Sequence, residues 1–82
     1  SVKQPVMADP TDKSQIGAPI PGLLTRINVK PGDKVKKNDS IAVIEAMKME
    51  TAVVATMDGT IKDVSVSEGD SVQAGELIIT IE

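Results

Sequence analysis

The chain contains neither cysteine nor histidine, and these two absences remove most of the common ways to build a catalytic or metal site. Without cysteine, neither a disulfide nor a thiolate-bound metal can stabilise the fold. Without histidine, the commonest general base and metal ligand is missing. Catalytic triads of the Ser/His/Asp or Cys/His type are therefore excluded. A carboxylate or lysine enzyme stays open, but we expect no catalytic residues and no metal site.

Aromatic residues are absent as well, since the chain has no Phe, Tyr or Trp. Stacking platforms for single-stranded nucleic acid therefore cannot form. A net charge of −3 also disfavours binding to nucleic acid and to acidic membranes. No apolar run approaches the length of a membrane span, and no signal peptide is visible. We therefore expect partners that are neither nucleic acids nor membranes.

Residues 1–15 differ in composition from the rest of the chain. They contain Pro5, Pro10 and many polar residues, and they follow neither helical nor strand periodicity. This composition is typical of a linker, and an irregular arm folded over a domain is the alternative. Because the chain starts at Ser1 rather than at a methionine, we expect residues 1–15 to be a linker or tail from a larger protein. Residues 16–82 are then expected to form one domain.

The remainder of the chain consists of short apolar segments rich in Val and Ile. Gly, Asp and Asn separate these segments, and no window of helical length shows a clean helical period. The sequence therefore predicts an all-β domain. The expected strands cover residues 23–29, 40–47, 50–55, 60–66 and 77–81.

An internal repeat is the strongest structural signal in the sequence. Residues 22–45 align without gaps with residues 59–82, at an offset of 37 residues. Two such units, neither able to bury its apolar face alone, are expected to form two antiparallel sheets packed face to face about a pseudo-twofold axis. The identical pairs include Gly22/Gly59, Val29/Val66, Gly32/Gly69, Asp33/Asp70, Val35/Val72, Ile41/Ile78, Ile44/Ile81 and Glu45/Glu82.

Each half of the repeat contains two turn signals. The first is a Gly-Asp pair, in which the glycine supplies the positive φ of a tight turn. At the second, Asn38 in one half aligns with Gly75 in the other. Asn and Gly adopt the left-handed conformation most readily, so the two halves are predicted to share one backbone geometry there.

The segment between the two halves carries the functional hypothesis. A two-residue hairpin turn at Met47 and Lys48 would join the strands on either side, although this turn lacks Gly, Asn and Asp. Hairpin turns of the primed types need positive φ, which is costly for Met and Lys. A local rule broken at an exposed point indicates function. The alternatives are a solvated lysine and methionines, Met47 and Met49, that fill gaps in a core.

The motif EAMKME at residues 45–50 resembles the signature of biotinyl domains, the biotin carboxyl carriers. The resemblance covers residues 16–82 and implies a flattened β-barrel, or sandwich, of two four-stranded antiparallel sheets. It also implies that Lys48 carries covalently bound biotin. Biotin protein ligase would then recognise the residues around this lysine, which are Glu45, Ala46, Met47, Met49 and Glu50.

The stretch ADPTDKSQIGAPIPG at residues 8–22 is similar to the lead-in of carrier domains of pyruvate carboxylases. This resemblance implies partner domains, a biotin carboxylase and a carboxyltransferase, between which the carrier moves a carboxyl group to convert pyruvate to oxaloacetate. It implies the cytoplasm of a bacterium or the mitochondrial matrix of a eukaryote. The sequence departs from the family pattern at Gln15, Asn38 and Thr56, where histidine, glycine and proline are common.

Three other functions stay open. The domain could serve a different biotin-dependent carboxylase or decarboxylase. It could be a lipoyl carrier, which resembles this chain in fold and in the lysine at a hairpin tip, although lipoyl lysines usually follow an aspartate and lack paired methionines. It could also be a β-rich interaction module whose lysine is not modified.

Overall fold

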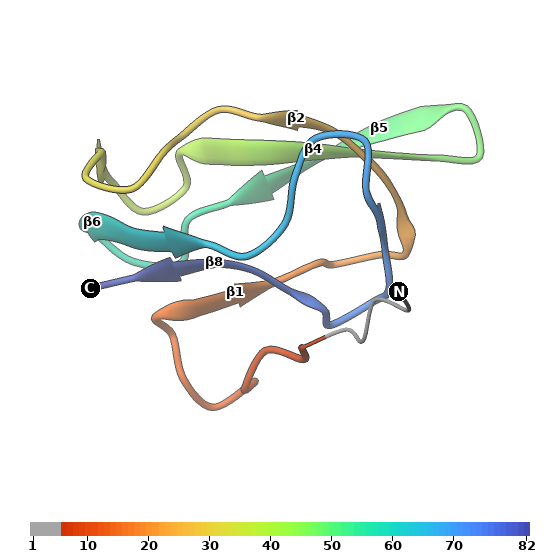
Figure 1. Cartoon of the computed structure of the whole chain (residues 1–82). Helices are drawn as coiled ribbons and strands as arrows, with labels where there is room; N and C mark the ends of the chain where they lie inside the picture. Colours follow the sequence, from red (N-terminus) through yellow and green to blue (C-terminus); the bar gives the residue numbers. More distant parts are fainter. Residues whose placement is uncertain (1–5) are drawn as a thin grey trace.

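Two four-stranded antiparallel sheets make up the computed structural model, which describes residues 6–82 (Figure 1). One sheet has the strand order β1-β8-β6-β3 and the other has the order β5-β4-β2-β7. The all-β prediction is therefore confirmed. Residues 6–82 contain no helix long and apolar enough to cross a membrane. The strands are β1 (Gln15–Gly17), β2 (Gly22–Ile27), β3 (Lys34–Val35), β4 (Ser40–Ala46), β5 (Met49–Val54), β6 (Gly59–Val64), β7 (Ser71–Val72) and β8 (Leu77–Ile81).

The five predicted strands correspond to β2, β4, β5, β6 and β8, with ends that differ by up to two residues. The predicted segments 23–29 and 60–66 extend too far, because the strands end at Ile27 and Val64. The sequence did not predict β1, β3 and β7. These strands have two or three residues each, which is too short for an alternating pattern to be visible.

The two halves of the repeat are interleaved and do not form one sheet each. β3 comes from the first half but pairs with β6 of the second, and β7 comes from the second half but pairs with β2 of the first. The equivalent pairings are Val35 with Gly59 and Val72 with Gly22. Each half therefore completes the sheet of the other, and the predicted pseudo-twofold relation holds.

The Gly-Asp turns have the same conformation in both halves. Gly32 and Gly69 have φ angles of 95° and 93°, in the left-handed region that favours glycine. No atom would lie within 4 Å of a Cβ added at either glycine, so conformation and not space explains the residue type. The carboxylates of Asp33 and Asp70 each accept a hydrogen bond of 3.0 Å from the backbone N–H three residues earlier.

The second turn confirms that different residues provide one backbone geometry. Asn38 has a φ of 76° and its equivalent Gly75 has a φ of 82°. The next residue, Asp39 or Glu76, accepts a hydrogen bond from the backbone N–H three residues earlier, at 2.9 and 3.0 Å. An acidic side chain thus closes the turn in both halves.

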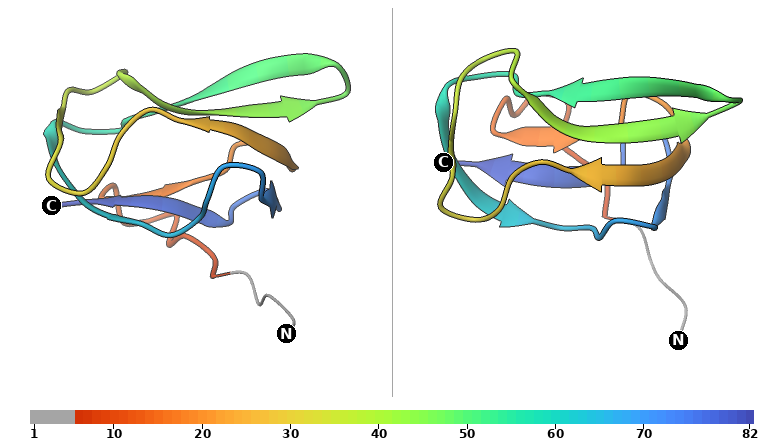
Figure 2. Two further views of the ribbon diagram at one scale, coloured as in Figure 1. Left: turned by 45° about the horizontal axis from the view of Figure 1, so that its top comes forward. Right: turned by 90° about the horizontal axis from the view of Figure 1, so that it is seen from above.

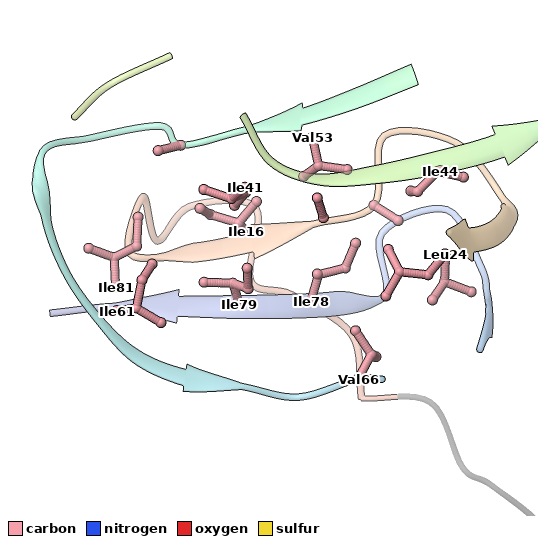
Figure 3. Close-up of a cluster of buried hydrophobic side chains, with 14 of the residues drawn as sticks. Ile16, Leu24, Ile41, Ile44, Val53, Ile61, Val66, Ile78, Ile79 and Ile81 are labelled. Atoms are coloured by element: carbon pink, nitrogen blue, oxygen red, sulfur yellow. The ribbon is translucent and has the colours of Figure 1, made fainter. Parts of the chain in front are cut away.

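The core lies between the two sheets and is entirely aliphatic (Figure 3). Leu24, Ile41 and Ile44 point into it from one sheet, and isoleucines of β6 and β8 meet them from the other. Val35 and Val72, the apolar residues after the Gly-Asp turns, are buried as their place in the repeat suggests. The largest fully buried side chains are Leu24, Ile41, Ile44, Ile61, Ile78, Ile79 and Ile81.

Residues 6–14 lie against the sheet that contains β8. The carbonyl oxygen of Val6 accepts a hydrogen bond from Leu77 N at 2.6 Å, and Ala8 N donates to the carbonyl oxygen of Gly75 at 2.8 Å. This contact is close, because a Cβ added to Gly17 would lie 3.1 Å from the Ala8 Cβ.

Two departures from the family pattern contact the same segment. The side-chain oxygen of Gln15 accepts a hydrogen bond from Asp9 N at 2.8 Å, and the Thr56 hydroxyl donates to the carbonyl oxygen of Lys13 at 2.6 Å. Residues 1–5 of the predicted tail lie outside the described residues. The division of the chain into a tail of residues 1–15 and a domain of residues 16–82 stays a prediction.

The shared turn geometry gives a first prediction. We expect Asn38→Gly to change the free energy of unfolding by no more than ~0.5 kcal/mol. Asn38→Val should lower it by about 1–2 kcal/mol, because a β-branched side chain is strained at this φ. Lys37→Val places the same side chain on the neighbouring exposed residue, which has no positive φ. Urea unfolding followed by far-UV circular dichroism measures all three, and equal losses for Asn38→Val and Lys37→Val would contradict the prediction.

Candidate functional site

The β4–β5 hairpin extends beyond the rest of both sheets, and its tip is the most prominent projection of the domain (Figure 2). The strands stay paired to their ends, where Ala46 faces Met49 and Glu45 faces Glu50. Only Met47 and Lys48 are left to form the turn, as predicted. The tip therefore holds one amine, carried at the end of a paired ribbon that is anchored in the core.

Both turn residues have left-handed backbone conformations. The φ angles are 52° for Met47 and 66° for Lys48, as a type I′ turn requires. Asn and Gly suit these positions, whereas other residues incur a cost of about 1–2 kcal/mol each. Local backbone preference therefore does not explain the residues found in this turn. Their side chains must be the reason for their presence.

The methionines on either side of Lys48 are exposed. The solvent-exposed fraction is 94% for Met47 and 69% for Met49, and Lys48 is exposed too. The alternative that Met47 and Met49 fill gaps in the core is therefore wrong. Two flexible thioether side chains at an exposed tip form a surface that can adapt to a partner.

The two faces of the hairpin differ in chemistry. Because side chains alternate along a strand, the pair of Glu45 and Glu50 lies on the outer face, where both residues are exposed. Ala46 and Met49 lie on the inner face, in line with the buried Ile44. The tip thus has an acidic outer face and an apolar inner face, with Lys48 at the boundary between them.

The base of the hairpin is fixed by a close approach of β2. A Cβ added to Gly22 would lie 2.6 Å from the carbonyl oxygen of Glu45 and 2.8 Å from Cγ2 of Ile44. Its equivalent Gly59 has the same constraint at the other end of the domain, where a Cβ would lie 2.5 Å from Cγ2 of Ile81. Both glycines are therefore needed to let neighbouring strands approach.

The pseudo-twofold axis relates β4 and β5 to β8 and β1, and only the first pair is joined by a turn. At the other pair, Ile81 N donates to the carbonyl oxygen of Ser14 at 2.7 Å, and the strands run on in separate directions. The repeat therefore provides two similar sheets but one hairpin tip. This asymmetry places the β4–β5 hairpin tip at a single end of the domain (Figure 1).

Sequence reasoning found the tip but missed two residues beside it. Ile20 and Pro21 lie in the segment between β1 and β2, and with the inner face of the hairpin they line a groove. They lie in the stretch 8–22 that resembles the lead-in of carrier domains, but they have no charged or nucleophilic group, so the sequence did not mark them as site residues. Residues 6–82 contain no group of three or more His, Cys, Asp or Glu side chains that could hold a metal ion.

The site presents an exposed amine that can accept an acyl group. The arrangement brings all six predicted site residues into one short hairpin, with Glu45 and Glu50 on its outer face. Glu45, Met47, Lys48, Met49 and Glu50 are exposed, and Ala46 is half-buried. An exposed amine at the end of a projecting hairpin fits modification by another protein.

Comparison with known proteins agrees with this geometry. A family described as "Biotin-requiring enzyme" matches residues 14–81. Pyruvate carboxylase of Staphylococcus aureus is 47% identical over 75 residues, which cover 92% of this chain and 6% of that protein. The biotin carboxyl carrier protein of Streptococcus mutans is 45% identical over 64 residues, which cover 78% of this chain and 49% of that protein.

Among solved structures, pyruvate carboxylase from Rhizobium etli matches with a TM-score of 0.80 and 36% identity, over 94% of this chain and 7% of that one. The chain thus spans only a small part of the carboxylases that it matches.

The exposure of the two methionines gives a second prediction. Met47→Ala and Met49→Ala should each lower the free energy of unfolding by less than ~1 kcal/mol, because neither side chain is buried. Ile44→Ala removes a fully buried side chain from the same hairpin and should cost about 2–5 kcal/mol. Urea unfolding followed by far-UV circular dichroism compares them. A loss in Met49→Ala as large as in Ile44→Ala would show that Met49 packs inward.

Proposed function

Because the chain belongs to the family of biotin-requiring enzymes, we propose that it is a biotin carboxyl carrier domain with biotin covalently bound to Lys48. The observation that carries this proposal is the position of Lys48, which lies in a strained type I′ turn at the tip of a projecting hairpin. No other lysine of residues 6–82 has a positive φ. The space around the tip suits the attachment of a large group.

Attachment forms an amide bond. The amine nitrogen of Lys48 attacks the acyl carbon of biotinyl-adenylate on the ligase, the bond from that carbon to the phosphate oxygen breaks, and AMP leaves. The attacking nitrogen must lose a proton, and the chain has no histidine to accept it. We therefore assign the proton acceptor to the ligase. The domain contributes an exposed nucleophile in a fixed position.

Recognition by biotin protein ligase would use both faces of the tip. The exposed thioethers of Met47 and Met49 offer an adaptable apolar contact. The carboxylates of Glu45 and Glu50 offer a pair of hydrogen-bond acceptors on the outer face. Half-buried Ala46 pairs with Met49 in the last strand pair before the turn, so it separates the turn from the buried Ile44.

When bound, biotin accepts a carboxyl group at one active site and releases it at another. The residues of this domain hold the attachment point away from the core and leave it accessible. Residues 6–82 contain no cluster of three or more side chains that could hold a metal ion, and the chain has no histidine. We therefore assign the two half-reactions to a biotin carboxylase and a carboxyltransferase. The similarity to pyruvate carboxylases supports pyruvate as acceptor and oxaloacetate as product. Another biotin-dependent carboxylase, or a decarboxylase, is the alternative parent.

Movement between two sites needs a tether. We propose that residues 1–15 connect the carrier to the rest of a larger enzyme. The described part of this segment, residues 6–15, is hydrogen-bonded to β8 and its neighbours, so it would travel with the domain. We propose that the enzyme lies in the cytoplasm if the source is a bacterium and in the mitochondrial matrix if it is a eukaryote.

The attachment site is tested by substitution. With biotin ligase, biotin and ATP, the wild-type domain should gain one biotinyl group, whereas Lys48→Arg should gain none because arginine keeps the charge but cannot form the amide. Lys62→Arg, at an exposed position of β6, is the matched control and should be modified like the wild type. Intact mass and avidin binding measure the product. Avidin binding by Lys48→Arg would exclude the assignment.

Modification should also change the charge of the domain. The amide removes one positive charge, so the net charge of −3 should become −4. The modified domain should therefore run further toward the anode on a native gel than Lys48→Arg treated in the same way.

The carrier role is tested with labelled bicarbonate. The biotinylated domain should acquire label only when a biotin carboxylase and ATP are both present, because the domain alone lacks the groups to activate bicarbonate. The unmodified domain is the control. Label on the isolated biotinylated domain would contradict the carrier role, and transfer of the label to pyruvate by a carboxyltransferase would support pyruvate carboxylase as the parent.

A further inference from the structure

A groove lies on the inner side of the hairpin tip, and the function proposed above uses only Ala46, Met47 and Met49 among the residues that line it. Its volume is about 440 Å³, and its walls come from the end of the hairpin and from the segment that leads into β2. It is lined by Ile20, Pro21, Ala46, Met47, Met49 and Thr51. Five of these six side chains are apolar.

The groove continues the core toward solvent. Along β5, the inner face passes from buried Val53 through half-buried Thr51 to exposed Met49. On β4, the inner face likewise passes from buried Ile44 to half-buried Ala46. The hairpin projects beyond the other sheet (Figure 2). The apolar side chains of Met47 and Met49 at its end are therefore exposed instead of buried in the core.

We propose that this groove is a resting site for the ring system of the biotin that is attached to Lys48 of the same chain. The inference rests on the proposed function, because it needs biotin on Lys48. In the resting state the arm folds back along the inner face of the hairpin. In the extended state the arm leaves the groove and enters the active sites of partner domains.

The position of the groove favours this occupant. Met47 and Met49 are both lining residues and neighbours of Lys48, so the groove begins at the attachment point. Thr51 lies three residues from Lys48, which corresponds to about 10 Å along a strand. The lysine side chain and the aliphatic chain of biotin together can span this distance. No movement of the backbone is needed.

The chemistry of the groove also fits biotin. The ring system carries no charge and includes a thioether and methylene groups, which match the aliphatic and thioether walls. The hydroxyl of Thr51 provides one polar group that can hydrogen-bond with the ureido part. The acidic pair of Glu45 and Glu50 lies on the opposite face of the hairpin, so it does not compete. The volume is within the range of about 300–1,000 Å³ that is usual for small-molecule sites.

A weak contact is sufficient because the ligand is tethered. A short flexible tether gives an effective concentration in the millimolar range, so a low intrinsic affinity still populates the resting state. An open groove with one polar side chain is suited to such a contact. Release is then easy when a partner active site offers more interactions.

Isotope-filtered NMR of the biotinylated full chain tests the resting site directly. Unlabelled biotin on a labelled domain should give nuclear Overhauser effects from its ring protons to the Ile20 methyl groups, which are distant from Lys48 in sequence. The methyl signal of Met49 should shift, and those of Met7 and Met57, which do not line the groove, should not. A domain acetylated on Lys48 is the control for loss of charge and should leave the Ile20 signals unchanged.

A substitution supplies an independent measurement. Ile20→Ala should abolish the contacts to residue 20 and raise the association rate with avidin by about two- to fivefold. Biotin held in the groove cannot bind avidin, so the fraction of biotin outside the groove limits the rate. Leu23→Ala, a similar loss of apolar volume on β2 outside the groove, should leave the rate unchanged. Circular dichroism verifies that both variants fold.

The outcomes separate the two proposals. If Lys48 cannot be biotinylated, the proposed function fails and the intact mass shows it. If Lys48 is biotinylated but no contact to Ile20 is seen and Ile20→Ala binds avidin at the wild-type rate, the resting site alone is refuted. Contacts to Ile20 together with a faster Ile20→Ala variant would establish it.

Discussion

Seven aliphatic side chains that are fully buried fill the space between the two sheets, and every other feature of this domain depends on their contact. The chain has no disulfide or aromatic residue to support the fold, and it is short enough for its stability to be marginal. Neither half of the repeat could bury its apolar face alone. Because β3 and β7 are exchanged between the halves, each sheet is complete only when both halves are folded, which makes the core and the topology a single cooperative unit.

The rigidity of this core fixes the position of the hairpin tip. β4 carries buried Ile41, Ala42 and Ile44 in the core, and from Ala42 to Ala46 it pairs with β5 in a regular register. Gly22 permits β2 to lie close against the base of this ribbon. The strained turn at Met47 and Lys48 can therefore be maintained by the strands below it, as expected for strain at a functional site.

The division of the hairpin into two faces connects the two proposals. The exposed acidic pair and the methionines are available to a modifying enzyme, whereas the inner face continues the apolar core into a groove. A carrier must present its bound biotin to several partners and shield the biotin while it is not in a partner active site. A tip with one open face and one apolar face could serve both needs with a single lysine between them.

The sequence by itself determined the all-β class, the pseudo-twofold repeat, the turn geometry at Asn38 and Gly75, and the hairpin turn at Lys48. These features depend on local backbone preferences and on an alignment of the chain with itself, and both can be examined without knowing which strands meet. The family motif also identified the tip before its exposure was known. Only the tertiary structure decided the exchange of β3 and β7, the contacts of residues 6–14 with β8, the close approach at Gly22 and the groove that includes Ile20 and Pro21. Each of these joins residues that are far apart in the chain, and their side chains meet only because the aliphatic core sets the distance and orientation of the two sheets.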